Sequence, residues 1–289
     1  EGKVRRGYSS KDVENAYQKW DRGQIGMMMS YIDEKVFATI NPEVTGMVPV
    51  PKGPTGKRGG ELNSRMMSLF SEIKDPAVRG IVADALGRIG YPQALPYLAR
   101  MAGDRDANEA VRRAADQAMK RIVVSDPAAR QKPAAELFRE LAEQYYANIE
   151  SLRPDVREPK ANVWFVHNEI LTPVEVPPEV YHYVMAMRSA QASLALKPDQ
   201  ADVVALWLAA DINREAALGL DVTSEEAVTN ADATRPENFP RSIYFARTCG
   251  PMYSQLALAR AIRDRDSNLA LGGIAALNVT AGAAAVVDL

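Results

Sequence analysis

One helical pattern occurs three times in this chain, and it constrains the fold more than any other feature of the sequence. The copies span residues 78–89, 111–122 and 269–280, and each begins with an apolar residue and continues with Ala-Leu or Ala-Met seven positions later. A turn that contains aspartate precedes each copy. Self-similarity at a spacing of about 30 residues is typical of stacked helical repeats, in which no unit can bury its apolar face alone. The sequence therefore predicts an all-α fold, an α-α superhelical solenoid.

The composition agrees with this fold and argues against several classes of protein. The hydrophobic fraction of 47% is rich in small residues, with 7% aromatics, and small apolar residues let helices approach closely. A net charge of −2 predicts no nucleic-acid partner, although a local basic stripe is left open. The single cysteine, Cys249, excludes an intramolecular disulfide and a cysteine-based zinc site. No apolar run reaches about 18 residues, so we expect no direct membrane insertion.

The first 60 residues divide into two predicted segments. Residues 1–40 are expected to form a helical pair, because Val13, Tyr17 and Trp20 share one helical face. Residues 41–60 are crowded with proline and glycine, which predicts a linker. Since the chain begins with glutamate rather than methionine, we expect a processed product or an excised piece. The compartment is left open between cytoplasmic and, with a removed signal peptide, extracytoplasmic.

Residues 61–130 carry strong signals for paired helices. An apolar stripe over residues 62–73 predicts one helix. Asp75 is a candidate N-cap for the next, Pro76 stands at its first position, and Gly90 follows its end. Each helix is too short to be stable alone, so its apolar stripe must pack against its neighbours.

This stretch resembles HEAT repeats, specifically the short type of the phycobilisome lyases. The residues that carry the resemblance are Asp75-Pro76-Ala77-Val78-Arg79, Ala83, Ala85-Leu86-Gly87, Ile89-Gly90, Pro92-Gln93-Ala94 and Leu98. The resemblance implies that the Asp-Pro turn and the Val-Arg pair hold successive helices in register. Residues 241–289 are expected to add a C-terminal HEAT-like repeat, in which Ala270 stands where the family usually has arginine.

Residues 131–219 differ from the flanking repeats. The β-rich runs within residues 162–176 predict a small β-hairpin inserted between helices. Ala186, Ser193 and Pro198 fall at the small, small and proline positions of a tetratricopeptide (TPR) repeat, which this segment resembles. That resemblance implies peptide binding in a concave groove.

Two further expectations concern the boundaries of elements in this half of the chain. The amphipathic pattern over residues 133–152 predicts one continuous helix. Residues 220–240 are polar and acidic and predict an acidic loop, with a short helix considered at residues 224–228.

No catalytic constellation stands out in the sequence. His167 and His182 are the only histidines, and neither stands beside a candidate nucleophile in sequence. Cys249 precedes a predicted helix whose dipole could lower the pKa of its thiol, but a lone cysteine is more typical of packing. We therefore predict a protein that is not an enzyme and that needs no cofactor or metal.

The favoured hypothesis is an interaction scaffold that binds a protein or peptide on the solenoid surface. Exposed aromatic and arginine side chains dominate binding energy at interfaces, and the candidates are Trp164, Tyr183, Trp207, Arg79 and Arg112. Arg79 and Arg112 could instead hold the repeats together. Two alternatives stay open, a lyase-like or cofactor-handling HEAT-repeat enzyme and a structural spacer domain of a larger protein. The oligomeric state is not predicted.

Overall fold

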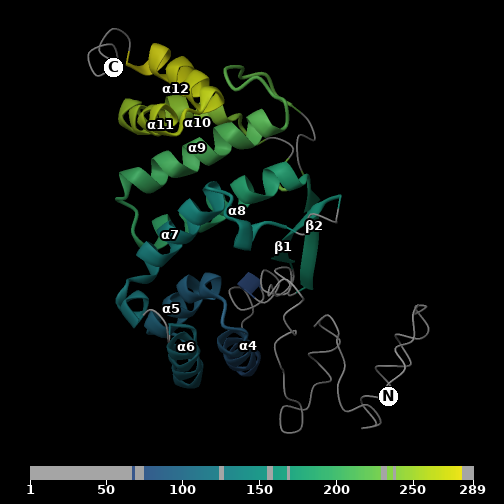
Figure 1. The fold of residues 1–289 in the computed structure, drawn as a ribbon, viewed down its shortest axis with the longest axis vertical. Helices are drawn as coiled ribbons and strands as arrows, with labels where there is room; N and C mark the ends of the chain where they lie inside the picture. The colour runs from purple at the N-terminus through teal and green to yellow at the C-terminus, as the bar shows by residue number, and fades with distance from the viewer. Residues whose placement is uncertain are drawn as a thin grey trace, which may run out of the picture.

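A computed structural model describes residues 67–68, 75–123, 127–154, 159–167, 170–228, 233–236 and 239–281. Within these residues the chain forms nine α-helices, stacked largely in pairs, and one antiparallel β-hairpin (Figure 1). The predicted all-α solenoid with an inserted hairpin is confirmed. The predicted helical pair at residues 1–40 and the linker at 41–60 lie outside the described residues, as does nearly all of the apolar stripe at 62–73.

The first helices of the described chain form the lower end of the stack in Figure 1. They are α4 (Pro76–Ile89), the 3-10 turn η1 (Pro92–Ala94), α5 (Leu95–Gly103) and α6 (Glu109–Ile122). Asp75 caps α4 as predicted, since its side chain accepts a hydrogen bond of 2.8 Å from the N–H of Ala77. Gly90 ends the helix with a φ of 76°, which a residue with a side chain would adopt only with strain.

Helices α4 and α6 lie in close contact at Gly87. A β-carbon on Gly87 would lie 2.7 Å from the α-carbon of Ala118, which is backbone and cannot rotate away. We expect Gly87→Ala to lower the free energy of unfolding by about 1 to 3 kcal/mol, because the two helices must move apart. Gly80 is the matched control on the same helix, since an added β-carbon there meets nothing within 4 Å. Gly80→Ala should be neutral or stabilising by up to about 1 kcal/mol in urea denaturation; equal losses for both variants would contradict the close contact.

The middle of the stack consists of three long helices and the hairpin. Its elements are η3 (Pro127–Gln131), α7 (Ala134–Tyr146), η4 (Glu150–Leu152), β1 (Ala161–His167), β2 (Ile170–Val176), α8 (Pro178–Leu196) and α9 (Ala201–Ala217). The single helix predicted over residues 133–152 is wrong at its end, because Asn148 turns left-handed with a φ of 49° and the chain leaves α7 at Tyr146. Helices α7 and α8 pack tightly, and the buried Ser193 hydroxyl donates to the carbonyl of Ala135 at 2.7 Å.

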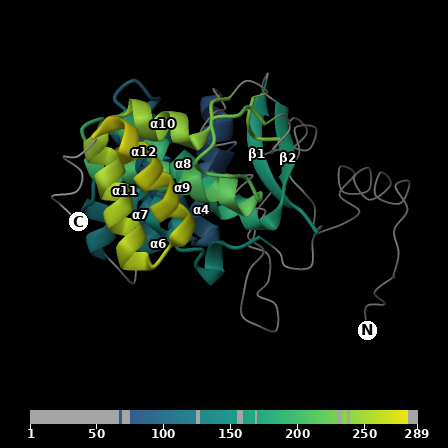
Figure 2. The same ribbon diagram turned by 90° about the horizontal axis from the view of Figure 1, so that it is seen from above.

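The hairpin lies where the sequence predicts it, on one side of the helical stack (Figure 2). In its register Trp164 stands opposite Pro173. The Trp164 carbonyl accepts hydrogen bonds from the Ser68 hydroxyl at 3.1 Å and from Arg188 at 2.8 Å, so it points away from β2. The nitrogen of Pro173 therefore faces the outer edge of β2, where a missing N–H removes no hydrogen bond between the strands.

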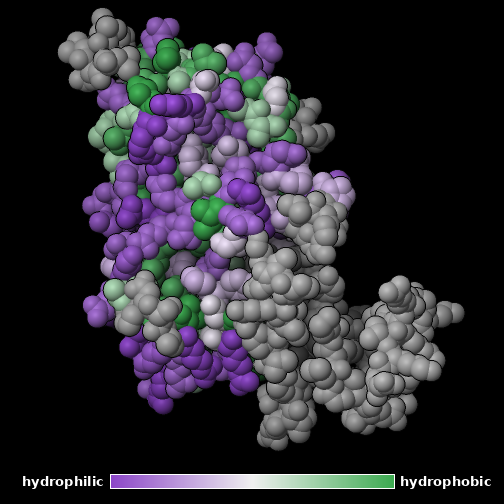
Figure 3. Space-filling model, viewed as in Figure 1, coloured by the Kyte–Doolittle hydropathy of each residue, from purple (hydrophilic) through white to green (hydrophobic). Residues whose placement is uncertain are grey.

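The C-terminal end of the stack is formed by α10 (Ser242–Thr248), α11 (Pro251–Asp264) and α12 (Ser267–Thr280). Asp266 caps α12 by accepting from the N–H of Leu269, and Gly272 lets this helix approach Ile212 of α9. Several large apolar side chains remain exposed on α11 and α12, near the top of Figure 3. They are Met252, Leu256, Ile262, Leu271, Ile274 and Val279.

The loop before α10 is anchored by a buried ionic cluster, although the sequence predicts only a polar, acidic loop. Glu215 of α9 is 0% exposed and accepts hydrogen bonds from Arg235 at 2.7 Å and Arg241 at 3.1 Å. It also accepts from the backbone N–H and the hydroxyl of Ser242, each at 2.8 Å. The short helix considered at residues 224–228 is wrong, since these residues form no helix or strand.

A second carboxylate, Asp211, shares Arg235 with Glu215. Burial raises the pKa of Asp211 from 3.8 to about 6, while hydrogen bonds from Arg235 and Ser242 outweigh burial and lower the pKa of Glu215. The folded protein holds the Asp211 proton more tightly than the unfolded chain does. The contribution of Asp211 to the free energy of unfolding therefore falls as the pH rises from about 4 to about 6.

Candidate functional site

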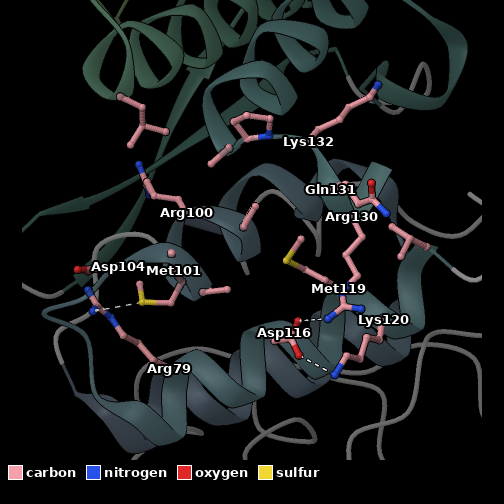
Figure 4. Close-up of a pocket in the computed structure, with 17 residues that line it drawn as sticks. Arg79, Arg100, Met101, Asp104, Asp116, Met119, Lys120, Arg130, Gln131 and Lys132 are labelled. Atoms are coloured by element: carbon pink, nitrogen blue, oxygen red, sulfur yellow. Dashed lines mark hydrogen bonds and ion pairs between the residues drawn. The ribbon is translucent and has the colours of Figure 1, made fainter. Parts of the chain in front are cut away.

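A hollow of about 1150 Å³ lies between helices α4, α5 and α6 and the start of α7. We call it the basic groove, and Figure 4 shows its lining side chains. The lining comes from α4, α5, α6, η3, α7 and the end of α8, so no single repeat makes the site. Its lining residues are Arg79, Ala99, Arg100, Met101, Ala102, Gly103, Asp104, Asp116, Met119, Lys120, Val123, Arg130, Gln131, Lys132, Pro133, Ala134 and Leu196.

Apolar side chains line part of the basic groove. Met101, Met119 and Val123 are each about 5% exposed and contribute to the apolar core beneath it. Leu196, at the end of α8, is 44% exposed and belongs to the same lining. Methionine is flexible and polarisable, so it adapts to differently shaped apolar groups. The basic groove can therefore accept an apolar side chain as well as a charged one.

Positive charge predominates around the basic groove, with five lysines and arginines and two aspartates in the lining. Asp116 is already paired, with Lys120 and with Arg130 at 2.7 Å each, and the hydrogen bond from Lys120 holds the pKa of this carboxyl below its usual value (Figure 4). One Asp104 carboxyl oxygen accepts the N–H of Asp106 in the turn after α5.

Arg100 supplies a positive charge that no described carboxylate neutralises by an ion pair. Its guanidinium lies 5.4 Å from the ring centre of Phe138 and 5.9 Å from that of Tyr97. These cation–π contacts hold the side chain in place without cancelling its charge. An anionic ligand in the basic groove could therefore pair with it.

Of the two predicted arginines, one lines the basic groove. Arg79 reaches it from α4, and its Nη1 lies 4.0 Å from the sulfur of Met101 (Figure 4). Arg112 does not line the basic groove, and its buried Nε has no hydrogen-bond partner among the described residues. Arg100, Lys120, Arg130 and Lys132 were not predicted, although the density of basic residues between 112 and 132 was a usable signal.

The predicted aromatic candidates do not gather at one exposed surface. Trp164 is 6% exposed, so its side chain offers little surface to a partner, and its predicted role in binding stays a prediction. Trp207 is half-buried and packs edge-on against Phe245 of α10, with ring centres 5.2 Å apart. Tyr183 is half-buried against Tyr146, with ring centres 6.0 Å apart.

Tyr183 lines a second, smaller hollow of about 490 Å³, together with Tyr146, Asn213, Asp264 and Asp266. Its polar groups largely satisfy one another. The Asn213 amide donates to the Tyr146 hydroxyl at 3.0 Å and to Asp266, and Asp264 pairs with Arg263 at 2.8 Å. These groups therefore have less need of a ligand than those of the basic groove.

The groups considered for catalysis are not brought together by the described structure. Burial raises the pKa of the Cys249 thiol, which fits a packed cysteine better than one activated by a helix dipole. Burial also lowers the pKa of His182 to about 4, which leaves a neutral imidazole against Tyr183. The side chain of His167 lies outside the described residues. Within the described part of the chain no three His, Cys, Asp or Glu side chains are arranged to hold a metal, and no helix is both long and apolar enough to span a membrane.

Comparison with known proteins supports the HEAT assignment for one part of the chain. Residues 62–144 match the family model for HEAT repeats, so the match covers α4, α5, α6 and most of α7 and includes most of the basic groove. No curated protein and no solved structure matches the chain. The resemblances to phycobilisome-lyase repeats, to TPR repeats over 131–219 and to a HEAT-like repeat over 241–289 stay predictions.

Proposed function

We propose that this protein is a non-enzymatic interaction scaffold that binds a segment of a partner protein in the basic groove. HEAT repeats in general serve as protein-interaction scaffolds, and residues 62–144 match that family. The observation that carries the proposal is the hollow of about 1150 Å³ within the same repeats. Its combination of buried methionines, an exposed leucine and accessible positive charge is typical of a surface that recognises a peptide.

Gly103 offers a direct test, because it lines the basic groove and an added β-carbon there meets nothing within 4 Å. Gly103→Trp is expected to fill the groove without disturbing the fold and to reduce capture of partner proteins at least about tenfold. Gly80→Trp is the matched control, since Gly80 is equally unobstructed but lies outside the basic groove.

The measurement is quantitative mass spectrometry of proteins captured from a lysate by the unchanged protein and by each variant. Support requires proteins that Gly103→Trp loses and Gly80→Trp retains, with equal thermal unfolding of the two variants. If Gly103→Trp captures the same proteins in the same amounts as the unchanged chain, the basic groove is not the binding site.

A further inference from the structure

We infer that the basic groove selects an acidic peptide segment of its partner, with an aliphatic side chain between the acidic residues. This inference rests on the proposed function and names the chemistry of the partner. It is carried by two features of the same lining, the excess of positive charge and the apolar groups that lie among the charges.

The charges of the lining fit a negatively charged ligand. Basic residues outnumber acidic ones by five to two in the lining, and one of the five, Lys132, pairs at 2.5 Å with Glu140, which is not a lining residue; the whole chain carries a net charge of −2. The excess is therefore local to this site. Asp116 pairs with Lys120 and Arg130 at 2.7 Å each and offsets part of their charge, whereas Arg100 forms no ion pair with a described carboxylate and remains able to pair with a ligand. A concave surface lined by one sign of charge concentrates ligands of the opposite sign.

The apolar part of the lining indicates that the ligand also carries an apolar side chain. Met101 and Met119 lie among the basic side chains (Figure 4). Leu196 belongs to the same lining and is 44% exposed. A ligand that offered only carboxylates would leave Leu196 in water. An aliphatic side chain flanked by acidic residues would contact Leu196 beside the methionines while an acidic neighbour met Arg100.

The same lining fits a nucleic acid poorly. Proteins that bind single strands combine positive charge with aromatic side chains on which bases stack. No tyrosine, phenylalanine or tryptophan is among the described lining residues, and two aspartates are. The positive charge of the basic groove thus favours a carboxylate-bearing peptide over a phosphate backbone.

Fluorescence anisotropy with synthetic probes tests this selectivity. The first probe is the labelled peptide Glu-Leu-Glu-Glu-Leu-Glu, and two others replace every Glu with Lys or every Leu with Ser. A fourth probe is a labelled single-stranded oligonucleotide of equal negative charge. We expect the first peptide to bind about tenfold or more tightly than each of the others, and its affinity to fall as salt rises.

Variants tie the binding to the basic groove. Arg100→Gln is expected to lower the affinity for the acidic peptide about two- to fivefold, which is the range for the loss of one partly exposed charge pair. Arg265→Asn removes the same charge from the exposed turn between α11 and α12, and asparagine tolerates its left-handed φ of 55°. This control should leave the affinity unchanged, and Gly103→Trp should abolish binding.

The outcomes separate this inference from the proposed function. The inference is overturned if the lysine peptide, the serine peptide or the oligonucleotide binds as tightly as the acidic peptide, or if none of the probes binds. If none binds but Gly103→Trp still loses partners in the lysate, the basic groove binds proteins of other chemistry. If Gly103→Trp loses neither the acidic peptide nor any lysate partner, the proposed function fails as well.

Discussion

Glu215→Ala is expected to lower the free energy of unfolding by about 3 to 5 kcal/mol, because it leaves the buried Arg241 without its counter-charge, while Arg235 keeps Asp211. Arg241 is 6% exposed and Glu215 is 0% exposed, so water cannot readily replace the lost carboxylate. The backbone N–H and the hydroxyl of Ser242 lose their acceptor in the same variant. Chemical denaturation monitored by far-ultraviolet circular dichroism measures the change.

Glu225 provides the control for this prediction. It pairs with Arg247 on the surface, and exposed ion pairs contribute at most about 1 kcal/mol. Glu225→Ala should therefore cost far less than Glu215→Ala. Losses of similar size would mean that the cluster around Glu215 contributes no more than a surface ion pair. We also expect Glu215→Ala to expose the loop before α10 to limited proteolysis, because Arg235 and Arg241 attach that loop to α9.

Phe138→Ala is expected to cost about 3 to 5 kcal/mol, the usual range for removing a fully buried aromatic ring. Phe138 is 0% exposed in α7 and meets Tyr97 of α5 edge-on, with ring centres 4.9 Å apart. The Phe138 ring therefore packs α7 against α5 and joins the first helices of the stack to its middle. Phe165→Ala, at a half-buried ring of the hairpin, should cost about 1 kcal/mol in the same denaturation experiment.

Phe138 also links stability to the basic groove. The Phe138 ring lies beneath Arg100. Removing the ring should lower the affinity for the acidic peptide, because it frees the Arg100 guanidinium to move and also destabilises the fold. Binding measured well below the unfolding temperature separates the two effects. An affinity equal to that of the unchanged protein would show that the ring does not position Arg100.

The sequence predicted helix ends well where they are marked by a capping residue or by a helix-breaking proline or glycine. Asp75, Pro76 and Gly90 fix both ends of α4, because each acts on the backbone next to it. The β-rich runs on either side of residues 168–169 likewise predicted the hairpin. The end of α7 was missed because it depends on the left-handed Asn148, and nothing in the apolar periodicity marks that position.

Sites that join distant segments were predicted far less completely. Of the basic groove only Arg79 was identified, since the other charges come from helices whose relative placement is decided by core packing. The ionic cluster was missed for the same reason. Asp211 and Glu215 stand within the apolar α9, and this interruption was the available signal that arginines from elsewhere in the chain would meet them.

The position of Pro173 affects how copies of this protein behave at high concentration. An isolated two-stranded ribbon offers backbone donors and acceptors along both margins, and such margins can recruit a strand from another molecule. Here the Trp164 carbonyl is occupied by Ser68 and Arg188 on one margin, and on the other the imino acid supplies no donor. Both features reduce the number of backbone groups that these margins offer to a strand of another molecule.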